Sequence, residues 1–229
     1  MYNYDKLKDD LYLYQDIKYR DFTKKLIPNM KYEIIGIRMN QLKNIAKKIS
    51  KEDYKSFINS NTHSTYEEIM LHGLVVGDIK ENITEVLKLY KEYIKYIDNW
   101  SLCDSTVANL NIISKYPDEG LKLAIWCLKH KKTYYKRVGY VILLDYYIKE
   151  EYLDLIYNLC NEYLIDEYYV QMAVAWLISI CYIKYPKQTE KYLSNNKLDT
   201  WTHNKSIQKI RESRQLSIEE KDRLLKYKK

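Results

Sequence analysis

Apolar residues recur every three or four positions along almost the whole chain, which is the spacing of amphipathic helices. In the segment YEEIMLHGLVVGDIK, residues 66–80, the apolar positions form one broad side of a predicted helix. Ser64 and Glu67 have the spacing of a capping box at its start. No segment is predicted to be a strand. Further helices are predicted over residues 5–26, 38–49, 83–96, 99–114, 118–129, 134–148, 151–163, 168–183, 187–194, 203–213 and 217–227.

The second half of the chain contains an internal repeat. YYKRVGYVILLDYYI, from Tyr134, aligns with YYVQMAVAWLISICYI, from Tyr168, at an offset of 34 residues. The same step leads from Tyr169 to His203 and from Tyr134 back to Trp100. A period of about 34 to 40 residues is typical of helical repeats, which stack on a shared core. The pattern therefore predicts one all-α domain over residues 1–229, a superhelical array of antiparallel helix pairs with a concave surface.

The composition agrees with a helical protein and gives no sign of a metal centre. Only five Gly and three Pro are present, which disfavours a turn-rich β fold. The four cysteines lack CxxC spacing and lie among apolar residues, so we expect buried, reduced thiols. The histidines form no HExxH motif. We expect neither a metal nor another cofactor.

Neither a membrane span nor a secretion signal is expected from the sequence. The N-terminal residues MYNYDKLKDD have no apolar core, and no stretch approaches eighteen consecutive apolar residues. We expect a cytoplasmic protein without membrane contact. An asymmetric repeat array is also expected to act as a monomer.

Charge is distributed unevenly along the chain, whose net charge is +7. Residues 203–229 hold nine Lys or Arg against four acids, and residues 129–137 hold five basic residues and no acid. Residues 145–167 hold seven acids and one lysine. A basic groove opposed by an acidic face favours a polyanionic partner, although solvated helix faces can also carry such charges.

The segment NWSLCDS, residues 99–105, has two interpretations. In the first it only starts a helix: Asp98, Asn99 or Ser101 would be the cap, and with Ser101 as cap Asp104 would occupy the third helical position. In the second, Trp100 and Asp104 form a chemical site, because positions i and i+4 share one helix face.

The chemical interpretation suits cleavage of a glycosidic bond. The Asp104 carboxylate could stabilise positive charge at an anomeric carbon and orient or deprotonate a water molecule. Trp176, two repeats later, could supply a second aromatic wall beside the sugar. Arg137 could hold a phosphate through a bidentate contact.

The sequence resembles the DNA alkylation repair enzymes, bacterial glycosylases of alkylated purines built from HEAT-like helical repeats. The resemblance runs from about residue 20 to residue 215. It is carried by the order and spacing of FTKKLIPN, IIGIRMNQLKNIAKKI, STYEEIMLHGLVVGDIK, IDNWSLCDS, KRVGYVILLDYYI, MAVAWLISICYIKYP and NKSIQKIRES.

The resemblance implies duplex DNA as partner and release of cationic bases such as 3-methyladenine and 7-methylguanine, in base excision repair and without a deep base pocket. The family's essential aspartate and the tryptophan before it match Asp104 and Trp100. Its groove arginine matches Arg137 and its second tryptophan matches Trp176. It also implies a cytoplasmic enzyme that joins the nucleoid when bound to DNA. The DNA backbone is expected to contact Arg137, Lys136, Lys132, Lys131, Lys205, Lys209 and Arg211.

The sequence departs from the family pattern in one early loop. GIRMNQLK stands where many relatives read closer to G-[IV]-[RQ]-T-P-x-L-R, so Met39, Asn40 and Lys43 differ. The aromatic residue that some relatives place before this glycine corresponds to Phe22 or Tyr32.

Two other functions are compatible with such an array. One is a DNA-structure or damage-binding protein without catalysis, and the other is a protein-interaction solenoid that receives an acidic peptide. Base release from methylated duplex DNA, measured beside DNA binding, separates the three.

Overall fold

The computed structural model describes residues 4–28 and 30–229, and across these ranges the protein is all-α, as predicted. In this described part of the chain the extended backbone pairs once, in an isolated bridge between Glu33 and Thr65. The chain divides into two compact units, Met1–Glu119 and Gly120–Lys229. The single domain over residues 1–229 and its concave groove stay predictions.

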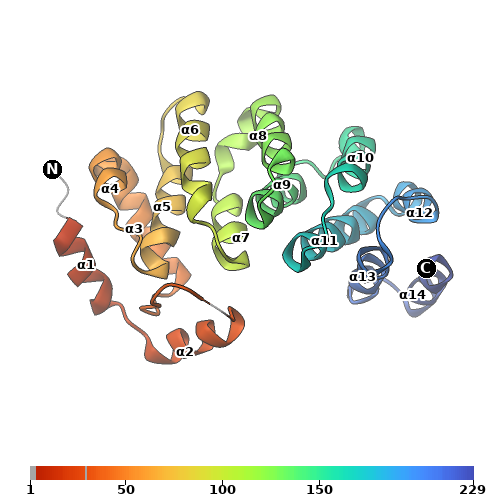
Figure 1. Cartoon of the computed structure of the whole chain (residues 1–229), viewed down its shortest axis with the longest axis horizontal. Coiled ribbons are helices and arrows are strands. Elements are labelled where there is room, and N and C mark those ends of the chain that lie inside the picture. The colour runs from red at the N-terminus through yellow and green to blue at the C-terminus, as the bar shows by residue number, and fades with distance from the viewer. Residues whose placement is uncertain (1–3, 29) are drawn as a thin grey trace. The chain divides into compact units, whose positions relative to one another are not determined.

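Unit 1 has a central helix, α5, with neighbours on several sides (Figure 1). Residues 66–76 of α5 are all buried, because α3, α6 and α7 pack around it. A Cβ at Gly73 would lie 2.5 Å from atoms of Thr106 and Tyr93, so only glycine permits this close packing. The helices of unit 1 are α1 (Tyr4–Leu13), α2 (Ile17–Leu26), α3 (Met39–Glu52), α4 (Tyr54–Ser60), α5 (Tyr66–Asp78), α6 (Ile83–Tyr93) and α7 (Trp100–Ala108), with 3-10 turns η1 (Ile94–Tyr96) and η2 (Asn111–Lys115).

Unit 2 is also built from helices that follow one another along the chain and pack side by side. Helices α9, α11 and α13 pack against one another in succession, and the chain returns between them through α10 and α12 (Figure 1). Helix α8 begins at Pro117, and its residues from Gly120 onward belong to this unit. The elements are α8 (Pro117–Lys129), α9 (Thr133–Tyr146), η3 (Glu150–Tyr152), α10 (Leu153–Tyr163), α11 (Tyr168–Lys184), α12 (Pro186–Ser194), α13 (Thr200–Arg211), α14 (Ile218–Arg223) and η4 (Leu224–Tyr227).

The helix starts confirm the repeat read from the sequence. Helices α5, α7, α9, α11 and α13 begin at residues 66, 100, 133, 168 and 200, which are steps of 32 to 35 residues. The four cysteines are buried, as predicted. None of the helices described is long and apolar enough to cross a membrane. Within the same residues, no group of three or more His, Cys, Asp or Glu side chains could hold a metal ion.

Several predicted helix boundaries were wrong. The range 5–26 is two helices, because the Asp16 side chain accepts the Tyr19 N–H at 2.9 Å and starts a new helix. The range 99–114 breaks after Ala108 into α7 and η2. The short helix α4 was not predicted.

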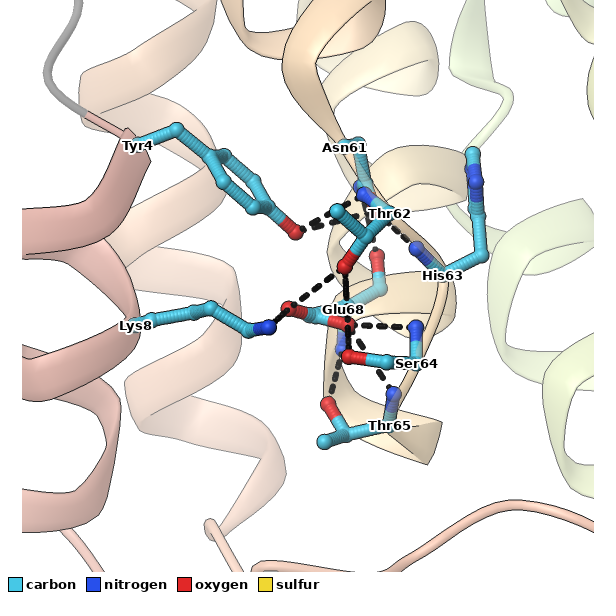
Figure 2. A network of polar contacts seen from close by, with 8 residues as sticks. All are labelled: Tyr4, Lys8, Asn61, Thr62, His63, Ser64, Thr65 and Glu68. Atoms are coloured by element: carbon cyan, nitrogen blue, oxygen red, sulfur yellow. Dashed lines mark hydrogen bonds and ion pairs between the residues drawn. The ribbon is translucent and has the colours of Figure 1, made fainter.

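The capping box of α5 lies one residue later than predicted. Thr65 Oγ1 accepts the Glu68 N–H at 3.2 Å, and the Glu68 carboxylate accepts the Thr65 N–H at 2.9 Å. Figure 2 shows that the same carboxylate also accepts bonds from the backbone N–H and the hydroxyl of Ser64, at 2.6 and 2.7 Å. Lys8 of α1 lies 3.6 Å from it. Glu68 thus joins α1 to the start of α5, and Glu67 is left for another role.

Candidate functional site

Helix α7 begins at Trp100 because Asn99 is its cap. The Asn99 side-chain oxygen accepts the Leu102 N–H at 3.0 Å, and its amide donates to Asp98 at 2.9 Å. Of the three predicted caps, Asn99 is therefore the one used. Asp104 falls in the second turn of α7, beyond the positions where a carboxylate caps exposed N–H groups. The prediction that this segment starts a helix was confirmed, and the placement of Asp104 at the third helical position, which required Ser101 as the cap, was wrong.

Trp100 and Asp104 are both half-buried, one helical turn apart on the same side of α7. The opposite side of the helix, which includes Leu102 and Thr106, is buried in the core of unit 1. The Trp100 indole N–H donates to the Leu26 carbonyl at the end of α2, at 3.4 Å. The indole and the carboxylate are therefore accessible groups on a helix whose other side is fixed.

The first turn of α7 is also tied to the first turn of α5. The Ser101 hydroxyl and the Tyr66 hydroxyl lie 2.7 Å apart, and the Tyr66 N–H donates to the Glu33 carbonyl at 2.8 Å. Burial raises the pKa of Tyr66 well above its usual range, so the hydroxyl keeps its proton. These bonds connect the start of α7 to the loop that precedes α3.

That loop is held by the buried carboxylate of Glu67. Three consecutive backbone N–H groups donate to it: Ile35 at 2.9 Å, Gly36 at 2.7 Å and Ile37 at 3.2 Å. Such a run of N–H groups forms a concave anion-binding nest, which here requires the φ of +96° found at Gly36. Burial raises the pKa of Glu67, and the three N–H bonds oppose that shift. A Cβ at Gly36 would also lie 2.6 Å from Asp16 O.

Within the predicted basic cluster of unit 2, Lys136 and Arg137 are buried, each only 6% exposed. The Lys136 ammonium donates to the Leu128 carbonyl at 2.7 Å and to the Tyr163 carbonyl at 2.9 Å, in the last turns of α8 and α10. The Arg137 guanidinium donates to the Tyr169 carbonyl at 2.8 Å. Burial lowers the pKa of Lys136. These contacts favour structural roles for both residues over the predicted phosphate contacts.

The other predicted DNA-binding cations are more accessible. Lys131 and Lys132 are exposed in the turn before α9, where the Lys132 ammonium lies 5.8 Å from the centre of the Tyr135 ring. Lys205, Lys209 and Arg211 are half-buried on α13.

Each of the three α13 cations has a polar partner. The Lys205 ammonium donates to the Gln208 side chain at 3.0 Å, and Lys209 lies 3.2 Å from the Glu212 carboxylate. The Arg211 side chain donates to the Lys221 carbonyl at 3.0 Å. Because the Gln208 side chain is neutral, this hydrogen bond does not neutralise the positive charge of Lys205.

Trp176 is half-buried in α11 of unit 2. Trp100 and Asp104 lie together in unit 1, whereas Trp176 and all the predicted cations lie in unit 2. A role of Trp176 at the same sugar as Trp100 stays a prediction.

The family model described as DNA alkylation repair enzyme matches residues 9–210, which is most of the chain. The chain belongs to the DNA alkylation repair enzyme family. Its membership was predicted from the sequence motifs, and it makes DNA alkylation repair the biological setting and DNA the substrate. No curated protein matches the chain.

For a DNA alkylation repair enzyme, sequence reasoning missed the residues that support α7. Glu67 was assigned to a cap, and Tyr66 was treated only as the start of a helix. One signal was available: two adjacent glutamates begin α5, whose following residues are almost all apolar, and a cap uses only one of them. The partner of the other glutamate, Glu67, could not be found from the local sequence, because the loop that donates to it lies about thirty residues earlier in the chain.

Proposed function

We propose that this DNA alkylation repair enzyme is a monofunctional DNA glycosylase. Its substrates would be positively charged alkylated purines in duplex DNA, such as 3-methyladenine and 7-methylguanine. The observation that carries the proposal is the pair formed by Trp100 and Asp104 on the accessible side of α7. Family membership supports the DNA substrate.

The chemistry needs little from the protein because the base already carries a positive charge. The bond between C1′ and the base nitrogen breaks, and its electron pair leaves with the base and neutralises it. No general acid is required for this departure. The sugar becomes a cation resembling an oxocarbenium ion, and the Asp104 carboxylate stabilises it.

A water molecule then attacks C1′ and loses a proton, either to the Asp104 carboxylate or to solvent. The products are a free base and an abasic strand. The Trp100 ring would lie against the sugar, and Trp176 is proposed as its second wall. Because water is the nucleophile and no lysine forms a Schiff base, the strand is not cut by β-elimination.

Contacts to the DNA backbone are proposed for the accessible cations of unit 2. Binding should weaken with added salt, and each phosphate neutralised adds about 0.9 to the slope of log K against log salt concentration. The cations proposed to make these contacts are Lys131, Lys132, Lys205, Lys209 and Arg211.

The decisive experiment compares the wild type with Asp104→Asn on methylated duplex DNA, with free 3-methyladenine and 7-methylguanine as the readout. Loss of the carboxylate charge should slow base release by about 10² or more, the cost of removing an electrostatic group aimed at the transition state. Asp118→Asn, at an exposed position on α8, is the matched control and should release bases at the wild-type rate.

Binding to the same duplex is measured in parallel. Near-normal base release by Asp104→Asn would refute the assigned role. A wild type that binds duplex DNA and releases no base would be a non-catalytic binder, and one that binds no DNA at low salt would be a protein-interaction solenoid.

A further inference from the structure

A shallow hollow of about 530 Å³ lies on one side of α13, within unit 2. Its lining includes the Trp201 ring and three cations, and it contains no carboxylate side chain. The lining positions of α13, singly or as adjacent pairs, recur every three or four residues from Thr200 to Arg211, so they form one stripe along the helix. The cations that line the hollow are Lys205, Arg211 and Lys228.

Trp201 presents an aromatic face at the edge of this hollow. Its side chain is 42% exposed, although tryptophan is a residue that folding normally covers. The Tyr168 ring lies beside it at 5.9 Å between centres and is 55% exposed. Because Tyr168 starts α11 and Trp201 lies in the first turn of α13, packing of these two helices places two accessible rings side by side.

The positive charge that lines the hollow is only partly compensated. The Lys205 ammonium lies 5.7 Å from the centre of the Trp201 ring, and its hydrogen-bond partner there is the neutral Gln208 side chain. Arg211 lies 3.5 Å from Asp222, whose carboxylate is largely exposed and therefore weakly held. An anion that entered the hollow would meet cations on more than one side.

The wall opposite α13 is held in place by the end of the described chain. The Asn204 amide donates to the main-chain oxygen of Lys229 at 2.9 Å, and the Lys229 N–H donates back to Asn204 at 3.1 Å. The buried ring of His203 donates from Nε2 to the Tyr227 carbonyl at 2.7 Å. These bonds on both sides of Lys228 fix its backbone beside α13 before any ligand binds.

We propose that this hollow binds an unpaired nucleotide of DNA, with the base stacked on Trp201 and the neighbouring phosphates held by Lys205, Arg211 and Lys228. Exposed aromatic rings beside cations are how proteins bind single strands, because every base has a flat face that can stack. A base inside an intact duplex offers no such face, since its neighbours cover both sides. The proposal rests on the proposed DNA binding and is independent of base excision.

The test uses unmethylated DNA, so that excision plays no part. Fluorescence anisotropy measures the affinity of the full chain for a labelled intact duplex and for the same duplex with a short single-stranded gap. The wild type should prefer the gapped DNA. Trp201→Ala should weaken gapped binding by about 5- to 150-fold, the range for loss of one base stack, and should leave intact-duplex binding nearly unchanged.

Two further variants separate stacking from general effects. Trp201→Phe keeps an aromatic face and should retain part of the preference for the gap. Trp126→Ala removes another exposed tryptophan, 38% exposed on α8, and should retain all of it. Thermal melts followed by circular dichroism check that each variant is folded.

Equal weakening of both DNAs by Trp201→Ala overturns the proposal, and so does an unchanged affinity for both. Equal binding of the two DNAs by the wild type also overturns it. Lys205→Ala should lower the salt slope on gapped DNA by about 0.7, the value for one phosphate of a single strand. Asp104→Asn should keep the preference for the gap, so a failure of the glycosylase proposal and a failure of this one give different results.

Discussion

Replacement of Glu67 by glutamine should destabilise unit 1 more than any surface substitution. The carboxylate is 1% exposed and accepts three backbone N–H groups at 2.7 to 3.2 Å. Glutamine has nearly the same shape but one oxygen fewer, and its NH₂ group must face at least one of these donors. The perturbation therefore removes charge and bonds without creating a large cavity.

The size of the effect follows from the number of donors. A hydrogen bond to a charged group contributes about 1.5–3 kcal/mol, and a buried donor left without a partner costs about 1–3 kcal/mol. Burial raises the pKa of Glu67, so part of the gain is already offset by the cost of burying its charge. With one donor unsatisfied and the others bonded to a neutral oxygen, we expect a loss of about 2–3 kcal/mol. Glu67→Ala would strand all three donors and should cost more.

The assay must report on unit 1 itself, because two compact units can unfold in separate steps. Hydrogen exchange of the amides of Ile35, Gly36 and Ile37 gives that local reading, and urea unfolding followed by circular dichroism gives the free energy. In Glu67→Gln these amides should exchange about 30- to 150-fold faster, which corresponds to the expected loss of about 2–3 kcal/mol. Glu92→Gln, at an exposed position on α6, is the matched control.

The reasoning would be refuted by protected amides in the variant together with a loss of free energy below about 0.5 kcal/mol, the size of an ordinary surface change. Such a result would mean that the loop before α3 holds its shape without the carboxylate. A faster exchange that spreads over all of unit 1 equally would indicate global destabilisation rather than a local anchor.

Two further predictions concern pH and the buried cations. His63 Nε2 lies 2.7 Å from His72 Nδ1, and burial lowers their pKa values from 6.5 to about 4 and about 3, so both rings are neutral in the folded state. The free energy of unfolding therefore has its full value above pH 6.5 and falls as the pH drops, because the unfolded chain takes up protons before the folded chain does. The contribution of His72 alone should lower this free energy by about 2 kcal/mol between pH 8 and pH 5. Thermal melts of His72→Gln should show a weaker pH dependence than those of the wild type. Arg137→Ala should lower the melting temperature and leave unchanged the slope of log K against log salt concentration for duplex binding. Lys132→Ala should instead lower that slope by about 0.9 and leave the melting temperature unchanged. A lower salt slope in a folded Arg137→Ala variant would contradict this expectation and support the predicted contact between Arg137 and a phosphate.

The helical class, the repeat step and the shared face of Trp100 and Asp104 were predictable because they depend on local periodicity. Two residues four positions apart lie on the same face of a helix, whatever that helix packs against. The register of the capping box was not predictable in the same way. Two S/T-x-x-E matches overlap at the start of α5, and the choice between Ser64 and Thr65 follows from the distant loop that takes Glu67.

The roles of the basic residues were the least predictable part of the site. Lys131, Lys132, Lys136 and Arg137 look alike in the segment KHKKTYYKR, and charge alone suggests one exposed patch. Their burial depends on where α9 starts and on which of its sides meets α8, α10 and α11. The first pair precedes the helix and the second pair faces inward, to carbonyl groups that a sequence cannot place.

The main-chain nest around Glu67 has a consequence for how this enzyme can change over time. Its ligands are backbone N–H groups, so the nest itself depends on Gly36 and Glu67, while the buried side chains of Ile34, Ile35 and Ile37 pack the loop into the core. Divergence at Met39 and Asn40, where the chain departs from its family pattern, therefore costs little. In a saturation mutagenesis library selected for folding, positions 39 and 40 should accept most residues, and positions 36 and 67 should accept almost none.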